Sequence, residues 1–322
     1  MGKEILITAA PGGHSGYAYA IGLRLRELGY KPVFLAAEGY DWIVKKLTRI
    51  GHVEYAPMPR RVGEPLYRSL HRWPAAFVKA FSKVKPEYRV LVSCGANLSI
   101  PPAIVSKLKG MYLVNVESIV RMSGPGKTPR FLHRIADLTL VHWPEQEKFL
   151  RGARVVGPIY EPPRFESSDG GYVLVTAGSV GFRELFDVVV EAGFERLVIQ
   201  TGRVDPDAYK KRAWKVFDYD PDLERWIANA SLVITHFPGM TSATAALAYK
   251  KPVVLVPAIH LTMSAPVTDC PLYSAKIGAV CINKLSPKAI LEATDKARKV
   301  DKPSYTEGAM EAARLISRLY EG

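Results

Sequence analysis

The segment ITAAPGGHSGYAYAIGLRLREL, residues 7–28, places a histidine in a glycine-rich connection between an apolar run and a helical pattern. Gly12 and Gly13 allow the backbone to approach a ligand closely, and the amides at a helix start attract an anion. His14 titrates near neutral pH and can accept a proton from a hydroxyl group. The pattern predicts either a general base or phosphate ligand at His14, or a structural histidine that caps the helix.

The same connection disfavours two common classes of nucleotide enzyme. It has GGHSG in place of the full G-x-G-x-x-G pattern, and Glu38 is the nearest acidic residue to the ribose-binding position of a dinucleotide dehydrogenase. It also lacks the Gly-Lys-Ser/Thr sequence of a P-loop, which disfavours a nucleoside triphosphatase.

A carboxylate is the second candidate for acid–base chemistry. Glu117 directly follows the apolar run MYLVNV, residues 111–116, at the carboxyl end of an expected strand. It is interpreted either as the base itself or as the partner that orients and charges His14. The alternative is a structural salt bridge with Arg121.

Two overlapping Asp-x-Asp pairs occur in FDYDPDLE, residues 217–224, and such pairs can bind the metal of a nucleotide sugar. Asp220, Pro221 and Asp222 fit better as the cap and first turn of the next helix. We therefore expect no metal site and no obligatory cofactor, with magnesium as an optional aid.

Short apolar runs alternate with helical patterns along the chain, as in parallel, doubly wound α/β sheets. Strands are expected at 4–8, 32–37, 88–93, 111–116 and 138–141 in the first half, and at 172–177, 196–201, 231–235, 252–257 and 279–282 in the second, with helices at 15–28 and 41–50. The chain is 322 residues long, which favours two domains. Two Rossmann-like domains facing a central cleft are the predicted fold.

A proline-, glycine- and serine-rich linker at 157–171 separates the two patterns. We therefore predict an N-terminal domain at 1–160 and a C-terminal domain at 161–322. The last helix, expected at 306–320, could cross back and pack onto the first domain.

The net positive charge of the chain comes entirely from its first half. Residues 1–160 contain 24 Lys+Arg and 11 Asp+Glu, whereas residues 161–322 contain 20 of each. This asymmetry favours an anionic partner for the first half, namely a phospholipid surface, a lipid diphosphate or a nucleic acid. A solubilising basic surface is the alternative.

Basic and aromatic residues are interleaved at 59–85, which suits an anionic membrane surface. Arg68, Arg72, Trp73 and Phe77 are the residues expected to face the membrane, unless the apolar side is buried in the domain core. No recognised nucleic-acid-binding motif accompanies this charge, so nucleic acid is not the expected partner. Liposome binding without RNA binding is the distinguishing observation.

No run is long enough to span a membrane, and the start lacks the pattern of a signal peptide, so a cytoplasmic location is expected. The three cysteines, Cys94, Cys270 and Cys281, match neither a disulfide framework nor a zinc spacing and are expected to be buried thiols. Only two glutamines and four asparagines occur, which suits a protein from a hot environment.

The GGH sequence after the first strand resembles the acceptor domain of GT-B glycosyltransferases that act on polyprenyl-diphosphate sugars. Residues 114–149 resemble the membrane-side subunit of the eukaryotic N-acetylglucosaminyltransferase that adds the second sugar to dolichol diphosphate. Residues 170–203 and 222–257 resemble the catalytic subunit of that enzyme. The chain is thus similar to a fusion of both subunits, and more distantly to the bacterial lipid II-forming glycosyltransferase. The residues that carry the resemblance of residues 114–149 are Glu117, Ala136, Asp137, Trp143, Pro144 and Glu145.

This resemblance implies a GT-B fold, with the lipid-diphosphate acceptor on the first half and the nucleotide sugar on the second. Gly12, Gly13 and Ser15 would contact the acceptor. The donor diphosphate would lie at the helix start after the strand that ends at His236. The expected donor-binding residues are Gly178, Ser179, His236, Gly239, Met240, Thr241 and Ser242.

Each donor loop also has a simpler interpretation, a strand-to-helix turn with a Ser/Thr cap or a tight turn at Gly178. The chain departs from the family at TSATAALAY, residues 241–249, which lacks the glutamate that usually binds the donor ribose. The identity of the donor sugar therefore stays open at this point.

The resemblance implies an inverting enzyme that moves N-acetylglucosamine from UDP-N-acetylglucosamine onto a dolichyl-type polyprenyl-diphosphate sugar. The product would be a β-1,4-linked disaccharide of the N-glycan precursor pathway, made at the cytoplasmic face of the membrane. A sugar-nucleotide 2-epimerase of the same fold and a nonenzymatic membrane- or nucleic-acid-binding protein are the alternatives. Linkage position, lipid chain and oligomeric state are not predicted.

Overall fold

A computed structural model describes residues 2–61, 64–259 and 265–322. The chain forms two compact units: unit 1 comprises Met1–Tyr160 with Thr306–Gly322, and unit 2 comprises Glu161–Tyr305. The first domain was expected to end at residue 160, with the last helix either in the second domain or returned to the first. The helix belongs to unit 1.

Unit 1 is built on a parallel sheet with the strand order β3-β2-β1-β4-β5-β6-β7. The order reverses between β1 and β4, where Ile7 pairs with Val92. Loops leaving the carboxyl ends of two such strands diverge to opposite faces of the sheet and open a crevice there. The strands are β1 (Glu4–Ala9), β2 (Lys31–Ala37), β3 (His52–Ala56), β4 (Val90–Ser93), β5 (Tyr112–Val116), β6 (Leu138–Val141) and β7 (Arg154–Val155).

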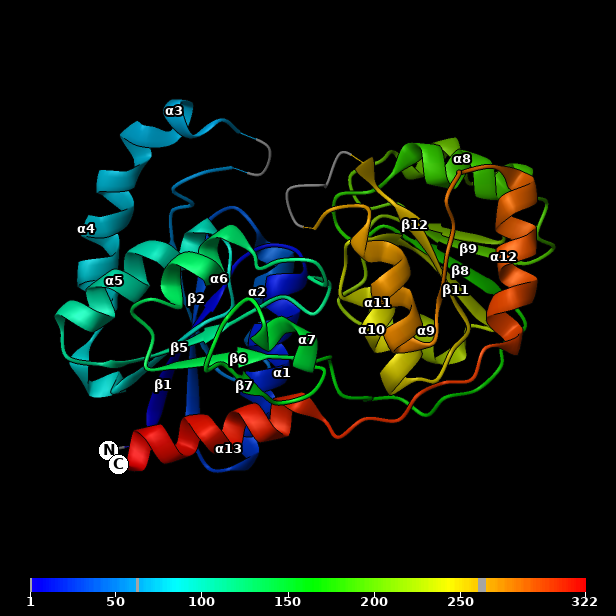
Figure 1. The fold of residues 1–322 in the computed structure, drawn as a ribbon. Helices are drawn as coiled ribbons and strands as arrows, with labels where there is room; N and C mark the ends of the chain where they lie inside the picture. The colour runs from blue at the N-terminus through cyan, green and yellow to red at the C-terminus, as the bar shows by residue number, and fades with distance from the viewer. Residues whose placement is uncertain (1, 62–63, 260–264) are drawn as a thin grey trace. The chain divides into compact units, whose positions relative to one another are not determined.

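Helices cover both faces of this sheet (Figure 1), and its central strands are therefore buried on both sides. On one face, Ala80 of α4 and Ala103 of α5 pack with Leu6 and Leu91 in a core cluster. On the other, α1 packs against α13 and lies over Phe34. The helices are α1 (Gly13–Glu27), α2 (Asp41–Leu47), α3 (Leu66–Ser69), α4 (Trp73–Lys83), α5 (Ile100–Leu108), α6 (Lys127–Leu132), α7 (Pro144–Glu147) and α13 (Gly308–Glu321).

Helix α13 completes unit 1 from the far end of the sequence. Its apolar face buries Ala309, Ala312 and Ile316 completely. The chain enters the helix through Gly308, where a Cβ atom would lie 2.4 Å from the Gly157 carbonyl oxygen, so only glycine fits. Helix α13 contacts α1. In Figure 1 the two chain termini lie together.

Unit 2 repeats the same plan with the strand order β10-β9-β8-β11-β12-β13, all parallel. Its order reverses between β8 and β11, where Thr176 pairs with Thr235. The strands are β8 (Val173–Thr176), β9 (Leu197–Gln200), β10 (Lys215–Phe217), β11 (Leu232–Phe237), β12 (Val253–Pro257) and β13 (Val280–Cys281).

The helices of unit 2 also lie on both faces of its sheet (Figure 1). Phe186 of α8 and Ile290 of α12 join the strands in one core cluster. Helices α10 and α11 pack against β11 and β12. The helices are α8 (Arg183–Glu191), α9 (Leu223–Asn229), α10 (Thr241–Ala243), α11 (Asp269–Ile277) and α12 (Pro287–Lys299), and a π-helical turn, Thr244–Ala248, directly continues α10.

The expectation of three buried thiols is wrong for two of the cysteines. Cys270 and Cys281 form a disulfide, while Cys94 is a buried free thiol. Gly278, with a φ of 65°, reverses the chain after α11, so the two Cα atoms are 6.1 Å apart despite a separation of 11 residues. Cysteine spacing alone does not carry this information, because the turn brings the pair together.

The disulfide predicts a stability difference between the oxidised and reduced protein. Reduction should lower the free energy of unfolding by about 2–3 kcal/mol, because the unfolded chain is no longer closed into a short loop. Urea unfolding with and without reductant measures this. A Cys270→Ala/Cys281→Ala variant serves as the control that does not respond to reductant. Three free thiols in the oxidised, denatured protein would contradict the pairing.

Candidate functional site

The connection between β1 and α1 forms a tight turn at the carboxyl edge of the unit 1 sheet. Gly12 caps the helix with φ 81° and ψ −148°, a backbone conformation that is essentially limited to glycine. The amide and hydroxyl of Ser15 both donate to the Gly12 carbonyl, at 3.3 and 2.8 Å. The first turn of α1 contains no acidic side chain. The positive end of the helix dipole is therefore not neutralised from within that turn.

His14 is half-buried and anchored across the sheet. Its Nδ1 lies 2.7 Å from the Cys94 carbonyl oxygen, in the loop after β4. A carbonyl oxygen only accepts, so Nδ1 carries the proton, and the neutral ring has its lone pair on Nε2. Burial lowers the pKa of His14 from its usual value, which keeps the ring neutral at pH 7. This is the protonation state and tautomer of a general base acting through Nε2.

The loop after β4 has an unusual backbone conformation, which allows it to pack closely against the His14 ring. Gly95 has a φ of 91°, and a Cβ atom there would lie 2.9 Å from Nδ1 of His14. Ala96 follows with a φ of 61°, a conformation that costs a non-glycine residue about 1–2 kcal/mol. Neither Cys94 nor Gly95 was expected at the site: a glycine directly after an apolar strand is a detectable signal, whereas the Cys94 carbonyl is a backbone group with none.

Glu117 organises the loop that follows β5. Its Oε1 accepts from the Ser118 amide at 2.6 Å, and its Oε2 accepts from the Gly126 amide at 2.9 Å. Its backbone carbonyl accepts from Nε2 of His142 at 2.8 Å. Burial raises the pKa of Glu117 to about 7, against the lowering effect of the two amides and of Arg121. Both oxygens of the carboxyl group thus help to close the turn between Glu117 and Gly126.

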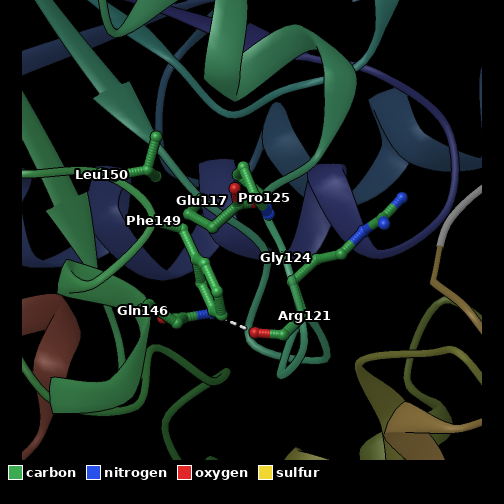
Figure 2. Close-up of a pocket in the computed structure, with 7 residues that line it drawn as sticks. All are labelled: Glu117, Arg121, Gly124, Pro125, Gln146, Phe149 and Leu150. Carbon is green, nitrogen blue, oxygen red and sulfur yellow. Dashed lines mark hydrogen bonds between the residues drawn. The ribbon is translucent and has the colours of Figure 1, made fainter.

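Figure 2 shows the small pocket that contains Glu117. The pocket is too narrow to admit a water molecule. The Gln146 side chain donates to the Arg121 carbonyl across it at 2.8 Å, while the Arg121 side chain extends out of the pocket (Figure 2). The lining residues are Glu117, Arg121, Gly124, Pro125, Gln146, Phe149 and Leu150.

The hydrogen bond expected from Glu117 to His14 is not among the described contacts. The orienting bond to His14 comes from the Cys94 carbonyl, and within the described ranges no hydrogen bond joins His14 to Glu117. The link between α1 and the Glu117 loop is Tyr17, whose hydroxyl accepts from the Ile119 amide at 2.9 Å. Both oxygens of Glu117 accept from amides of their own loop, while Nδ1 of His14 donates to the loop after β4. The sequence pattern had indicated no role for Tyr17.

Three of the expected donor-binding residues come together at the strand reversal in unit 2. A Cβ atom on Gly239 would lie 3.1 Å from the His236 ring, and one on Gly178 would lie 3.7 Å from it. Gly178, with a φ of 62°, donates its amide to the Thr176 hydroxyl at 3.1 Å. His236 therefore lies between the loops that leave β8 and β11.

The other expected donor residues differ in their exposure. Ser242 is fully buried, donates to the Gly239 carbonyl at 2.9 Å and contacts the Tyr273 hydroxyl at 3.1 Å. Met240 is also buried, whereas Ser179 and Thr241 are half-buried. The Ser242 hydroxyl thus shapes the loop from within, and Tyr273 of α11 is a further residue that sequence analysis did not identify.

The four residues expected to face a membrane differ in exposure too. Arg68 is exposed, Arg72 pairs with Glu64, and Trp73 is half-buried. Phe77 packs against the core cluster of unit 1, which corrects its expected outward position. The large exposed apolar side chains of this segment are Leu66, Tyr67, Leu70, Val78 and Phe81. None of the helices in the described ranges has the length and apolar character needed to cross a membrane.

The aspartates at the start of α9 have structural partners. Asp220 accepts from the Asp222 amide at 2.9 Å and from the Trp226 indole at 2.8 Å. Asp222 forms an ion pair with Arg164. Among residues 2–61, 64–259 and 265–322, no group of three His, Cys, Asp or Glu side chains is arranged to hold a metal ion.

Comparison with known families gives a match on unit 2. Residues 172–262 match the glycosyltransferase family 28 C-terminal domain. The matched range runs from the residue before β8 past the end of β12, so it includes both loops that meet at His236.

Full-length similarities agree with the fold. The chain is 24% identical to a UDP-N-acetylglucosamine–N-acetylmuramyl-(pentapeptide) pyrophosphoryl-undecaprenol N-acetylglucosamine transferase of Dechloromonas aromatica (strain RCB), over 99% of this chain and 100% of that protein. Acinetobacter baumannii MurG superposes with a TM-score of 0.63 at 18% identity, over 98% of this chain and 99% of MurG.

A Listeria monocytogenes protein described as a UDP-N-acetylglucosamine 2-epimerase superposes with a TM-score of 0.68 at 14% identity, over 100% of this chain and 98% of that chain. At such identities the solved structures establish the fold alone. The expected fold class, GT-B with two Rossmann-like α/β domains, is confirmed.

The close approach of Gly95 to His14 predicts that Gly95→Ala destabilises unit 1 by about 2–4 kcal/mol, from left-handed backbone strain and the clash with the ring. Gly29→Ala is the matched control, because Gly29 has a φ of 86° and no described heavy atom within 4 Å of an added Cβ. The control should lose only about 1–2 kcal/mol. Urea unfolding measures both, and equal losses would contradict the contact.

The buried carboxyl of Glu117 predicts a pH-dependent stability. Its pKa of about 7 lies above the unfolded value of about 4.3, so its contribution is complete below pH 4.3 and lost as the pH rises through 7. Glu117→Gln should be less stable than the wild type at pH 5 by about 1–3 kcal/mol, because one amide loses its acceptor. The difference in the free energy of unfolding between Glu117→Gln and the wild type should be smaller at pH 8 than at pH 5.

Urea unfolding of both proteins at several pH values tests this expectation. Glu147→Gln, at an exposed position of α7, is the control that should follow the wild type at every pH. A gap between Glu117→Gln and the wild type that does not change with pH would show that burial does not govern the ionisation of Glu117.

Proposed function

We propose that the protein is an inverting glycosyltransferase that moves N-acetylglucosamine from UDP-N-acetylglucosamine onto a polyprenyl-diphosphate-linked sugar. The observation that carries this proposal is the family 28 match at residues 172–262, which includes the loops around His236. The full-length relative, named as a transferase that uses a pyrophosphoryl-undecaprenol acceptor, supports the same reaction class.

The chemistry proposed for unit 1 is general base catalysis by His14. Nε2 removes the proton from the acceptor hydroxyl as its oxygen bonds to C1 of the donor sugar, and the bond from C1 to the diphosphate breaks, releasing UDP. Attack opposite the leaving group inverts the configuration at C1. The turn at Gly12, Gly13 and Ser15 and the start of α1 would hold the acceptor diphosphate. Glu117 acts here by shaping the neighbouring loop.

The donor is assigned to unit 2. The turns at Gly178–Ser179 and Gly239–Ser242 would hold the donor diphosphate with backbone amides, as helix starts hold anions in other proteins. No obligatory metal is required by this scheme, and magnesium remains an optional aid to the leaving diphosphate.

The charge distribution supports an anionic acceptor for unit 1. This unit contains 26 Lys+Arg and 14 Asp+Glu, whereas unit 2 contains 18 and 17. We extend the proposal to peripheral association with an anionic membrane at its cytoplasmic face, through Arg68 and the exposed apolar residues of α3 and α4. Nucleic acid is not proposed as a partner.

The finer proposal is a fused form of the two-subunit dolichol-diphosphate N-acetylglucosaminyltransferase, which makes a β-1,4-linked disaccharide of the N-glycan precursor. It rests on the resemblance of residues 114–149 and 170–257 to the two subunits. The competing acceptor is the N-acetylmuramyl-pentapeptide diphospholipid named for the Dechloromonas relative.

Labelled UDP-N-acetylglucosamine offered with each acceptor distinguishes these forms. Transfer to dolichyl-diphosphate N-acetylglucosamine supports the fused eukaryotic-type enzyme, and transfer only to the muramyl lipid supports the bacterial type. UDP-glucose and UDP-N-acetylgalactosamine test the donor, and a chelator tests the metal. Absence of both transfer and hydrolysis would overturn the enzyme proposal in favour of a nonenzymatic binding protein.

A 2-epimerase is the second candidate, favoured by the TM-score of 0.68 to the Listeria protein. Such an enzyme inverts C2 of the sugar without a lipid acceptor. Proton NMR of UDP-N-acetylglucosamine incubated with the protein alone tests it. A C2-epimerised product formed at the same rate with or without acceptor would replace the transferase proposal.

The role of His14 predicts a loss of turnover on its replacement. His14→Ala and His14→Gln should each lower kcat at least about a hundredfold, because no side chain remains to take the acceptor proton. His52→Ala, at an exposed position of β3, is the matched control and should retain wild-type kcat. Near-normal kcat values in both His14 variants would exclude His14 as the general base.

The pKa of His14 predicts the pH profile of the wild type. Burial lowers this pKa, so the imidazole stays neutral until the pH falls to a value below 6.5. The kcat/KM for the acceptor should fall only as the pH drops through that lowered pKa. Initial rates at saturating donor measure the acidic limb. A limb centred above pH 6.5 would contradict the assignment.

A further inference from the structure

Two buried hydroxyl groups lie beneath the loop that anchors His14. Thr8 stands near the end of β1, and Ser99 ends the 3-10 turn Asn97–Ser99 after β4. Both side chains are completely buried, so neither can touch a substrate. Their oxygens lie 2.7 Å apart.

The hydrogen bonds of this pair run in one direction. Ser99 Oγ lies 2.5 Å from the Gly95 carbonyl oxygen, which can only accept, so the Ser99 proton points there. Thr8 must then be the donor to Ser99. Thr8 Oγ1 in turn accepts from the Cys94 amide at 3.1 Å. The chain of bonds runs from the Cys94 amide through Thr8 and Ser99 to the Gly95 carbonyl.

This series of hydrogen bonds fixes the backbone on both sides of the Cys94 carbonyl, the group that accepts the hydrogen bond from Nδ1 of His14. The backbone held in this way is strained at Ala96, which has a φ of 61°, whereas the φ of 91° at Gly95 is accessible to glycine. The Ser99 amide adds a further bond to the Ala96 carbonyl at 3.1 Å. The loop keeps its conformation because the buried hydroxyls satisfy it from below.

We propose that Thr8 and Ser99 are positioning residues that set the tautomer and orientation of His14 through the Cys94–Gly95 backbone. Their relevance to catalysis rests on the proposed function of His14, whereas the coupling itself rests on the geometry of unit 1. Thr8 and Ser99 act through His14 and take no part in proton transfer to or from substrate.

The test measures the His14 imidazole by ¹⁵N NMR in the full chain without substrate, with the signal assigned from His14→Gln. In the wild type, we expect the nitrogen shifts of a ring held as the Nδ1–H tautomer. In Thr8→Val and Ser99→Ala, the Nδ1 and Nε2 shifts should move toward each other, because the ring exchanges between both tautomers. Thr8→Ser keeps the hydroxyl and should retain the wild-type shifts.

Ser106→Ala is the matched control. It removes an equally buried hydroxyl of unit 1 whose bond, to the Ala103 carbonyl at 2.8 Å, lies within α5, and it should leave the His14 signals unchanged. Far-UV circular dichroism and urea unfolding establish that each variant is folded. If Thr8→Val or Ser99→Ala fails to fold, Thr8→Ser and Ser99→Thr are compared with the wild type by the same shifts, and a ring that changes tautomer in both would overturn the proposal.

Wild-type shifts in folded Thr8→Val and Ser99→Ala would overturn the proposal directly. Transferase rates are measured in parallel, with an expected fall in kcat of about tenfold and little change in the KM of the donor. If the two variants show altered shifts but the wild type has no transferase activity, the positioning role stands and the proposed function is refuted. The two failures are therefore distinguishable.

Discussion

The site of unit 1 depends on one hydrogen bond, from Nδ1 of His14 to the Cys94 carbonyl. This bond joins the loops that leave β1 and β4, the two strands between which the sheet order reverses. It fixes which nitrogen carries the proton and so leaves Nε2 as the basic atom. The glycine at position 95, the left-handed Ala96 and the buried hydroxyls beneath them are all arranged around this contact.

Unit 2 uses a related arrangement at its own strand reversal. Thr176, at the end of β8, accepts the Gly178 amide, as Thr8 near the end of β1 accepts the Cys94 amide. In each unit a buried threonine hydroxyl thus stabilises a turn with positive φ beside a histidine. The two domains share this feature without sharing sequence, and in both it lies where two parallel strands part.

The fold was largely predictable from the sequence, because apolar runs with helical segments between them specify buried parallel strands. Every expected strand is present, whereas β3, β7 and β10 were not expected. These three occupy three of the four sheet edges, where fewer side chains are buried and the apolar pattern is weak, although the fourth edge strand, β13, was expected. The site was predictable in part: His14 was identified from its glycine-rich loop, but its partner was not, since a backbone carbonyl has no signature in sequence. The Cys270–Cys281 pairing required the turn at Gly278, which spacing rules do not describe.

Because α13 returns to unit 1, the chain passes between the two units twice, after Tyr160 and before Thr306. Unit 2 is thus topologically an insertion in unit 1. A fragment ending at residue 160 would lack the helix whose buried alanines cover α1, and would expose that apolar surface. The ends of the chain, joined by the ion pair of Lys3 and Glu321 at 2.5 Å, are instead suited to a circular permutation that opens the protein elsewhere.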